Sequence, residues 1–226
     1  MLVFENVSID LAGVPVLRSV TTELKAGTTV ALVGRNGAGK TTLLRTAMGF
    51  LKPKTGRILF DGEELSRLPA HQRAEQGIGY APEDRVIFPT LSVEENLRLP
   101  CEAHGLDEAL IKDRLQDVLG VVPQLREMLP RSGAALSGGQ GKMVALGRAL
   151  MAGTRLVLLD EPFQGLAPVL AMQYAEALSR LRSLRPELCV LITESNASLL
   201  KHVPTRPLAL ERGALTEGAA SVAHTH

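Results

Sequence analysis

The chain has 226 residues, of which 45% are hydrophobic and 22% charged, so disorder is excluded and a packed core is expected. The 25 basic and 24 acidic residues nearly cancel, which excludes a general electrostatic attraction to nucleic acid or anionic lipid. No apolar run approaches the roughly 20 residues of a membrane-spanning helix, and the start of the chain lacks the pattern of a secretory signal. Two distant cysteines predict neither a disulfide framework nor a metal cluster, so we expect a cytoplasmic chain with reduced thiols.

The first third of the chain predicts strands on either side of a glycine-rich loop. The first 32 residues have the pattern of three strands, the last of them a nearly continuous apolar run at 28–34. A helical pattern begins at Lys40 and stops at Gly49. After it we expect a strand at 56–62 that ends in an Asp-Gly turn, a short helix at 69–77 and a short strand at 78–82.

From about Ser92 to Met151 the pattern is helical. Ser92 and Glu95 have the spacing of a capping box, in which each side chain bonds a backbone amide of the other. The remaining elements expected in chain order are helices at 107–119 and 137–151, a buried strand at 155–161, a helix at 169–184, a buried strand at 188–194, a hairpin at 207–218 and a frayed tail.

This alternation of strands and helices predicts the α/β class with a parallel sheet. The mainly helical stretch lies between two predicted parallel strands, so we interpret it as an inserted subdomain. No internal repeat or low-complexity linker interrupts the chain.

The glycine-rich loop matches the phosphate-binding pattern G-x4-G-K-[ST] and lies between a predicted strand and a predicted helix, as that pattern requires. Its backbone amides and the helix start are expected to face phosphate oxygens. Lys40 would contribute a full charge near the β and γ phosphates, and the Thr41 hydroxyl would ligate Mg²⁺. The nucleotide-binding residues expected here are Gly34, Arg35, Asn36, Gly37, Ala38, Gly39, Lys40, Thr41 and Thr42.

Two adjacent carboxylates end the predicted strand at 155–161. Ligands sit at the carboxyl ends of parallel strands, and neighbouring side chains on a strand point to opposite sides. We therefore expect Asp160 to hold the metal and Glu161 to act as general base toward the attacking water. Taken alone, an acidic strand end is weak support for either role.

A second glycine turn opens the helix at 137–151. Ser137 is a good helix cap, and a helix start is another anion site. Taken alone, the turn is better interpreted as a capped helix of the inserted subdomain. Its residues are Ser137, Gly138, Gly139 and Gln140.

Three motifs, GRNGAGKTT, LSGGQ and RLVLLDEP, in this order and spacing resemble the ATP-binding subunit of an ABC transporter. IGYAPEDRVIFPTLSVEENLRL and EPFQGLAP are similar to the smaller ATPase of branched-chain amino acid uptake systems and their urea and amide relatives. The resemblance implies a P-loop NTPase (RecA-like) parallel sheet core and an N-terminal antiparallel β subdomain, which together span about 1–82 and 153–215. It also implies a helical subdomain at about 83–152, with a tail at 216–226, all within one ABC ATPase domain.

In such ATPases two subunits pack head to tail, and each ATP lies between one phosphate loop and the LSGGQ turn of the other subunit. The resemblance therefore implies ATP and Mg²⁺ as cofactors, with Ser137 and Gly139 contacting the γ-phosphate held by the partner. It further implies membrane permease subunits as partners, an indirect link to a solute-binding protein, no nucleic acid, and a place on the inner face of the cell membrane. A heterodimer of ATPases is favoured, and a homodimer stays open.

Two positions depart from the family pattern early in the chain. Leu11 occupies the position where an aromatic residue usually stacks on adenine, so we expect weaker or less selective base binding. Glu83 replaces the usual sensing glutamine, and its carboxylate is still an oxygen ligand for Mg²⁺. The resemblance implies that the segment from Glu83 to Leu99 senses ATP and touches the permease. Phe88 and Pro89 lie in this segment, and the alternative to a permease contact is that they serve ordinary packing.

Two further departures concern the catalytic machinery. Ser195 stands where many relatives carry a switch histidine that contacts the γ-phosphate, and Ala167 stands where many carry an aspartate. Either the site built on this phosphate loop is slow and a partner ATPase carries a better one, or Ser195 positions a water in the role of the histidine.

Three functions compete on these observations. An ATPase that energises an importer agrees with every motif. A regulatory subunit with little turnover agrees with Ser195 but not with Glu161. An ABC ATPase of DNA repair or translation is disfavoured, since the chain has one cassette, no cysteine cluster and a neutral charge balance.

Overall fold

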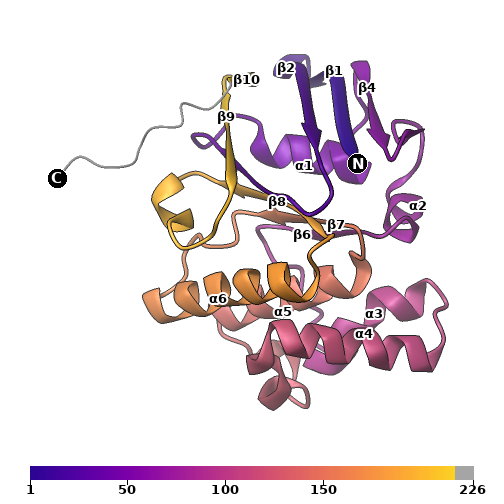
Figure 1. Cartoon of the computed structure of the whole chain (residues 1–226), viewed down its shortest axis with the longest axis vertical. Coiled ribbons are helices and arrows are strands. Elements are labelled where there is room, and N and C mark those ends of the chain that lie inside the picture. The colour runs from indigo at the N-terminus through magenta and orange to yellow at the C-terminus, as the bar shows by residue number, and fades with distance from the viewer. Residues whose placement is uncertain (217–226) are drawn as a thin grey trace.

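The computed structural model describes residues 1–216, which form two β-sheets and two layers of helices (Figure 1). The antiparallel sheet lies at one end, the central sheet crosses the middle, and the long helices cover the far face of the central sheet. In the part of the chain that the structure describes, no helix has both the length and the apolar character needed to cross a membrane. The expected tail lies outside the described residues except for Thr216, which belongs to a strand.

The antiparallel sheet has the order β2-β1-β4-β5. Alternate residues of β1 are buried, because successive side chains of a strand point to opposite faces and only one face meets the core. Its strands are β1 (Leu2–Leu11), β2 (Val14–Leu24), β4 (Thr55–Phe60) and β5 (Glu63–Glu64).

The central sheet has the order β10-β9-β3-β8-β7-β6 and is parallel except for the terminal β9–β10 hairpin. The predicted parallel sheet and closing hairpin are therefore confirmed. The strands are β3 (Thr29–Val33), β6 (Ile78–Ala81), β7 (Leu156–Asp160), β8 (Cys189–Glu194), β9 (Arg206–Glu211) and β10 (Ala214–Thr216).

Two hydrophobic cores lie on opposite faces of the central sheet. On β7, Leu156 and Leu158 enter the core shared with the antiparallel sheet, whereas Val157 and Leu159 enter the core shared with the long helices. A strand buried on both faces needs apolar residues throughout, which explains the continuous apolar run of the sequence.

The helices occupy two layers. α1 (Lys40–Met48) lies between the two sheets, with the short α2 (Ala70–Glu75) beside it. The other helices are α3 (Val93–Ala103), α4 (Glu108–Val121), α5 (Gly138–Ala152) and α6 (Pro168–Leu184), joined in places by the short 3₁₀ turns η1 (Pro123–Met128), η2 (Gly133–Ala135) and η3 (Ala197–Leu200).

The capping box predicted at Ser92 is present, since the Ser92 side chain accepts from the Glu95 amide and Glu95 accepts from the Ser92 amide. The 3₁₀ turns are absent from the sequence predictions because their few residues carry no helical periodicity. The strand expected at 155–161 is one residue too long at its end: β7 stops at Asp160, and Glu161 leaves the strand.

Sheet register brings the site together at the carboxyl ends of three neighbouring strands. Val33 of β3 is paired with Glu194 of β8, and Thr193 of β8 is paired with Asp160 of β7. The phosphate loop leaves β3 at this edge and enters α1. The motifs that are far apart in sequence therefore meet where parallel α/β sheets bind ligands.

Candidate nucleotide-binding site

The phosphate loop curls between β3 and α1. Gly37 and Gly39 have φ angles of 79° and 106°, in the left-handed region that glycine adopts without strain. A Cβ atom on Gly39 would lie 2.8 Å from the Leu17 Cδ2 atom, so this position also needs glycine for space. The loop thereby brings its amides and the N-terminus of α1 to one concave surface.

Lys40 is held by the loop and by Glu161, which directly follows β7. Its Nζ donates to the carbonyl oxygens of Gly34 at 2.6 Å and Arg35 at 3.1 Å. It also lies 3.0 Å from Oε1 of Glu161, and the two side chains are only 4% and 6% exposed. The ammonium is therefore oriented by fixed oxygen atoms, and the Glu161 carboxylate is neutralised within the same chain.

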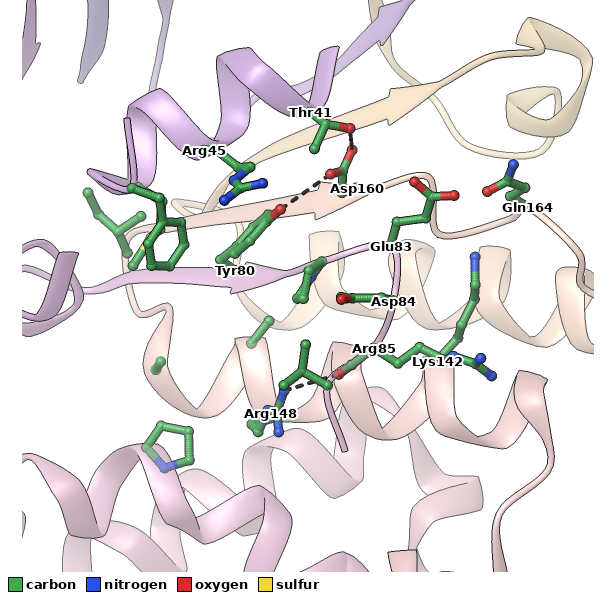
Figure 2. A pocket seen from close by; sticks show the side chains of 18 of the residues that line it. Thr41, Arg45, Tyr80, Glu83, Asp84, Arg85, Lys142, Arg148, Asp160 and Gln164 are labelled. Carbon is green, nitrogen blue, oxygen red and sulfur yellow. Dashed lines mark hydrogen bonds between the residues drawn. The ribbon is translucent and has the colours of Figure 1, made fainter. Parts of the chain in front are cut away.

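Asp160 accepts hydrogen bonds from three hydroxyl groups. Thr41 Oγ1 and Thr193 Oγ1 donate to Oδ1 at 3.2 and 2.7 Å, and the Tyr80 hydroxyl donates to Oδ2 at 3.3 Å. Burial raises the pKa of Asp160, and the three hydroxyl groups act in the opposite direction. Figure 2 shows Thr41 and Tyr80 converging on this carboxylate from α1 and β6. Tyr80 was not predicted as a site residue, and nothing in its sequence context marks it as one.

Glu161 has a strained backbone. Its φ angle of 46° is left-handed, which costs a residue other than glycine roughly 1–3 kcal/mol. The strand alternation used to separate Asp160 from Glu161 therefore does not extend to Glu161. The two carboxylates nevertheless have different partners, because Glu161 contacts Lys40 and accepts from Ser195 Oγ at 3.0 Å through Oε2.

Glu194 is a buried carboxylate that the sequence analysis did not select. It ends the apolar strand β8 and is fully buried. Oε1 accepts from the Phe163 amide at 2.9 Å, whereas Oε2 has no hydrogen-bond partner among the described residues. Burial raises the pKa of Glu194 to about 7, and the negative charge of Glu161 adds to this effect. The available signal was the same one that marked Asp160 and Glu161: an acidic residue at the end of an apolar strand.

A cavity of about 440 Å³ lies over the phosphate loop. Lys40, Thr41 and Glu161 line it, and so does Glu83, which the sequence analysis expected near the metal. Leu11 is not among its lining residues, whereas Val16 and Gln164 are. Neither Val16 nor Gln164 was predicted. The full lining is Val16, Asn36, Gly37, Gly39, Lys40, Thr41, Thr42, Glu83, Glu161 and Gln164.

The Ser137 turn caps α5 and is not part of that cavity. Ser137 is exposed, accepts from the Gln140 amide, and its own amide donates to Gln140 Oε1. Arg85 donates to the Gly138 carbonyl oxygen at 2.9 Å. None of the four residues of the Ser137 turn therefore lines the phosphate-loop cavity, although Gly138 and Thr41 both line a larger groove beside it.

A larger groove of about 1110 Å³ opens beside the phosphate-loop cavity (Figure 2). The two cavities share Thr41, Glu83 and Gln164. The groove runs between the central sheet and α5, with Phe50 and Tyr80 on one side and Arg148 on the other. A ligand in the groove is thus separated from the phosphate site by only one layer of side chains.

Residues 17–164 match the sequence profile of the ABC transporter family. The chain belongs to this family. As an ABC transporter ATPase it binds and hydrolyses ATP, and the family predicted from the three motifs is confirmed. The match includes the phosphate loop, the Ser137 turn and Glu161.

Two curated ABC ATPases illustrate how far the similarity extends. The chain is 38% identical to the high-affinity branched-chain amino acid transport ATP-binding protein BraG of Pseudomonas aeruginosa, over 94% of this chain and 90% of BraG. It is 35% identical to the lipopolysaccharide export system ATP-binding protein LptB of Haemophilus influenzae, over 87% of this chain and 80% of LptB. ABC ATPases of different transport systems are thus similar to this chain at nearly the same level.

The fold is shared with solved ABC ATPase structures. An ATP-binding subunit of an ABC transporter superposes with a TM-score of 0.82 at 29% identity, covering 97% of this chain and 90% of that one. The predicted P-loop NTPase fold, with its antiparallel β subdomain and helical layer, is therefore confirmed for this ABC ATPase.

Proposed function

We propose that this ATPase energises an importer for branched-chain amino acids or related small polar solutes. The observation that carries the solute class is the 38% identity to BraG across 94% of the chain. The 35% identity to LptB favours a second candidate, an export system for a lipid-linked polymer. In either system the chain works at the inner face of the cell membrane beside permease subunits, and in an importer a solute-binding protein delivers the solute.

Thr41, Asp160 and Glu83 would hold Mg²⁺ together with the phosphates. The donor set fits this ion, because Mg²⁺ prefers one or two carboxylates with substrate phosphates and water. The hydroxyl of Thr41 already lies 3.2 Å from the Asp160 carboxylate, and Thr41, Glu83 and Asp160 all line the larger groove. When bound, Mg²⁺ neutralises charge on the phosphate oxygens.

Lys40 and Glu161 perform the steps that belong to the protein. The γ-phosphate competes with Glu161 for the Lys40 ammonium, since Nζ now lies 3.0 Å from Oε1. Release from this ion pair leaves the Glu161 carboxylate free to accept a proton from the attacking water. Ser195, 3.0 Å from Oε2, orients that carboxylate rather than reaching the phosphate. The phosphate loop amides hold the β and γ phosphates in line with the water.

The Ser137 turn completes the pocket of a second ATPase subunit. This proposal is supported by the exposure of Ser137 and by its absence from the phosphate-loop cavity of its own chain. ATP then lies between the two subunits and holds them together until it is hydrolysed. A heterodimer is favoured, because Ser195 is too short to replace an imidazole that reaches the phosphate.

The large groove is the proposed contact for a permease segment. Its lining includes Phe50 and Val86, which are 52% and 50% exposed. Phe88 lies nearby, 43% exposed, with the Arg148 guanidinium 5.7 Å from the centre of its ring. Exposed apolar side chains around a groove are typical of protein contacts. Because Glu83 lines both cavities, a segment bound there would lie next to the phosphate site.

Glu161→Gln tests the proposed chemistry. The amide keeps the shape of the side chain but cannot accept a proton, so we expect turnover to fall by roughly 100- to 10,000-fold. ATP binding should persist, and a dimer should accumulate in ATP on size-exclusion chromatography. Turnover equal to that of the wild-type chain would contradict the role of Glu161. The regulatory alternative instead predicts a wild-type chain that binds ATP with hardly measurable turnover.

Transport by the assembled system tests the solute class. The chain should be reconstituted in vesicles with permease subunits, a solute-binding protein and a second ATPase of such an import system. We expect uptake of labelled leucine that stops when Glu161→Gln replaces the wild-type chain. ATP hydrolysis without uptake of any branched-chain or small polar solute would favour the export candidate.

A further inference from the structure

Helix α5 carries two features on its first two turns. Ser137 caps the helix, and Lys142 follows five residues later, which corresponds to a rise of about 7.5 Å along the axis. Lys142 Nζ donates to the carbonyl oxygen of Glu161 at 2.6 Å. Figure 2 shows the Lys142 side chain extending from its helix toward the segment that carries Gln164. One helix therefore contacts the general base of its own chain and presents the turn that faces the partner.

The hydrogen bond from Lys142 holds the peptide of Glu161, whose backbone is strained. Glu161 has a left-handed φ of 46°, and its amide donates to Thr193 Oγ1 at 3.1 Å and to the Thr193 carbonyl oxygen at 3.2 Å. The Glu161 carbonyl oxygen accepts from Lys142 and, at the longer distance of 3.3 Å, from the Gln164 amide. Thr193 thus anchors one side of this peptide and Lys142 the other, and together they set the direction of the carboxylate.

We propose that Lys142 is a positioning residue for Glu161, through which α5 links the partner-facing turn to the general base. Lys142 is half-buried among Glu83, Glu161 and Glu194, and the cation Arg85 lies on the same side. The proposal rests on the role proposed above for Glu161. A movement of α5 at Ser137 is transmitted to the Glu161 carbonyl oxygen because helix and side chain are joined by this hydrogen bond.

The prediction is a loss of turnover without a loss of ATP affinity. Lys142→Met keeps the apolar length and removes the donor. Because a small misplacement of a catalytic group can cost up to 100-fold, kcat should fall roughly 10- to 100-fold, with KM for ATP within about twofold of the wild-type value. Lys142→Arg retains a donor and should recover most of the rate. Lys112→Met, on the exposed face of α4 with its partner Glu108, is the matched control and should change neither.

Amide hydrogen exchange gives a readout that does not depend on turnover. In Lys142→Met the amides of 161–166 should exchange faster, first at Gln164, whose acceptor is the Glu161 carbonyl oxygen. If Lys142→Met fails to fold, Lys142→Gln takes its place in the experiment. Its side chain is too short to reach that oxygen, so the same faster exchange is expected. Both measurements use the full chain in the ATPase dimer that it forms.

Glu161→Gln, measured in parallel, separates the two proposals. If Glu161→Gln abolishes turnover while Lys142→Met leaves kcat and exchange unchanged, the positioning role of Lys142 is wrong and the general base stands. If Glu161→Gln keeps its turnover, the proposed base itself is wrong. An equal rise of KM and fall of kcat in Lys142→Met would also overturn the proposal, because it would indicate a general loss of the folded site.

Discussion

The phosphate loop and the Ser137 turn are both glycine-rich helix starts, yet their surroundings differ. At the phosphate loop, the buried Lys40 is paired with Glu161 and hydrogen-bonded to two backbone carbonyl oxygens. At the Ser137 turn, the side chain is exposed and its hydrogen bonds return to Gln140 within the same turn. The phosphate loop, with Lys40 paired to Glu161, is called the interlocked half. The exposed Ser137 turn is called the open half.

This difference supports the proposal of a site that is half built in each chain. The interlocked half needs an anion to displace an existing ion pair, so it responds to the charge of the ligand. The open half has only uncharged residues in the turn itself, and the Arg85 guanidinium donates to its Gly138 carbonyl oxygen. Its energetic contribution therefore depends on the nucleotide that the partner subunit brings to it. Variants of the two halves should therefore fail in different ways.

The largest expected effect is at Lys40. Lys40→Met removes the ammonium that is proposed to bind the β and γ phosphates, and we expect the Kd for ATP to rise by about 100-fold or more, since hydrogen bonds between charged groups contribute roughly 1.5–3 kcal/mol each. Isothermal titration with ATP and Mg²⁺ measures it. ATP affinity within threefold of the wild-type value would show that the interlocked half is not the phosphate site.

Lys40→Met also leaves the Glu161 carboxylate buried without its partner, which costs about 3–5 kcal/mol of folding stability. The double variant Lys40→Met with Glu161→Gln removes both charges. It should recover most of the unfolding free energy while ATP binding stays weak. Recovery of ATP binding in the double variant would mean that misfolding, rather than the lost ammonium, caused the defect.

Sequence patterns predicted the fold and the chain segments of the site, but not its hydrogen-bond network. Lys40, Asp160 and Ser137 were found because each belongs to a short motif with a fixed local geometry. Tyr80 was missed because its importance depends on sheet register, which places β6 beside the strand of Asp160. Glu194 was missed although it ends an apolar strand as Asp160 does, because no motif surrounds it. The φ angle of Glu161 was missed for a related reason: strain of this kind is maintained by tertiary contacts, and the local sequence does not record it.

A pH dependence should distinguish the interlocked half from the open one. Burial raises the pKa of Glu194 from an ordinary value of 4.5 to about 7. Glu161, Lys142, Lys40 and Tyr174 lie around it. Because the folded pKa lies above the unfolded one, this contribution to stability is complete below about pH 4.5 and is lost as the pH rises through about 7. The loss is on the order of 3 kcal/mol.

Urea unfolding between pH 5 and 8 measures the fall in the free energy of unfolding that is expected from Glu194. Glu194→Gln should remove this fall. The matched control is Glu95→Gln, which keeps a side chain able to complete the Ser92 capping box. Hydrogen bonds to the Ser92 backbone and side chain lower the pKa of Glu95, so its contribution is present above the unfolded pKa and is lost as the pH falls. Parallel pH profiles for Glu194→Gln and the wild-type chain would show that Glu194 does not titrate in this range.

The smallest expected effect is at the open half, and the chain contains a control for it. Ser137 and Ser92 both complete capping boxes, so Ser137→Ala and Ser92→Ala should each cost about 1 kcal/mol of folding stability. Ser137→Ala alone also removes the hydroxyl proposed to contact the partner's nucleotide, a loss of about 2 kcal/mol. Sedimentation of the Glu161→Gln chain with ATP should therefore show dimerisation weakened about 30-fold for each nucleotide site that carries Ser137→Ala. Ser92→Ala should have no such effect.

Affinity for ATP in the dilute monomer should be the same for both variants, because neither serine lines the phosphate-loop cavity. This pair of measurements separates helix stability from nucleotide contact, since the first is lost in both variants and the second in only one. If both variants weaken the ATP-dependent dimer equally, lost helix stability rather than a lost nucleotide contact of the Ser137 hydroxyl explains the effect. If neither does, the partner's nucleotide does not contact the Ser137 turn, and the open half is a capped helix of the inserted layer.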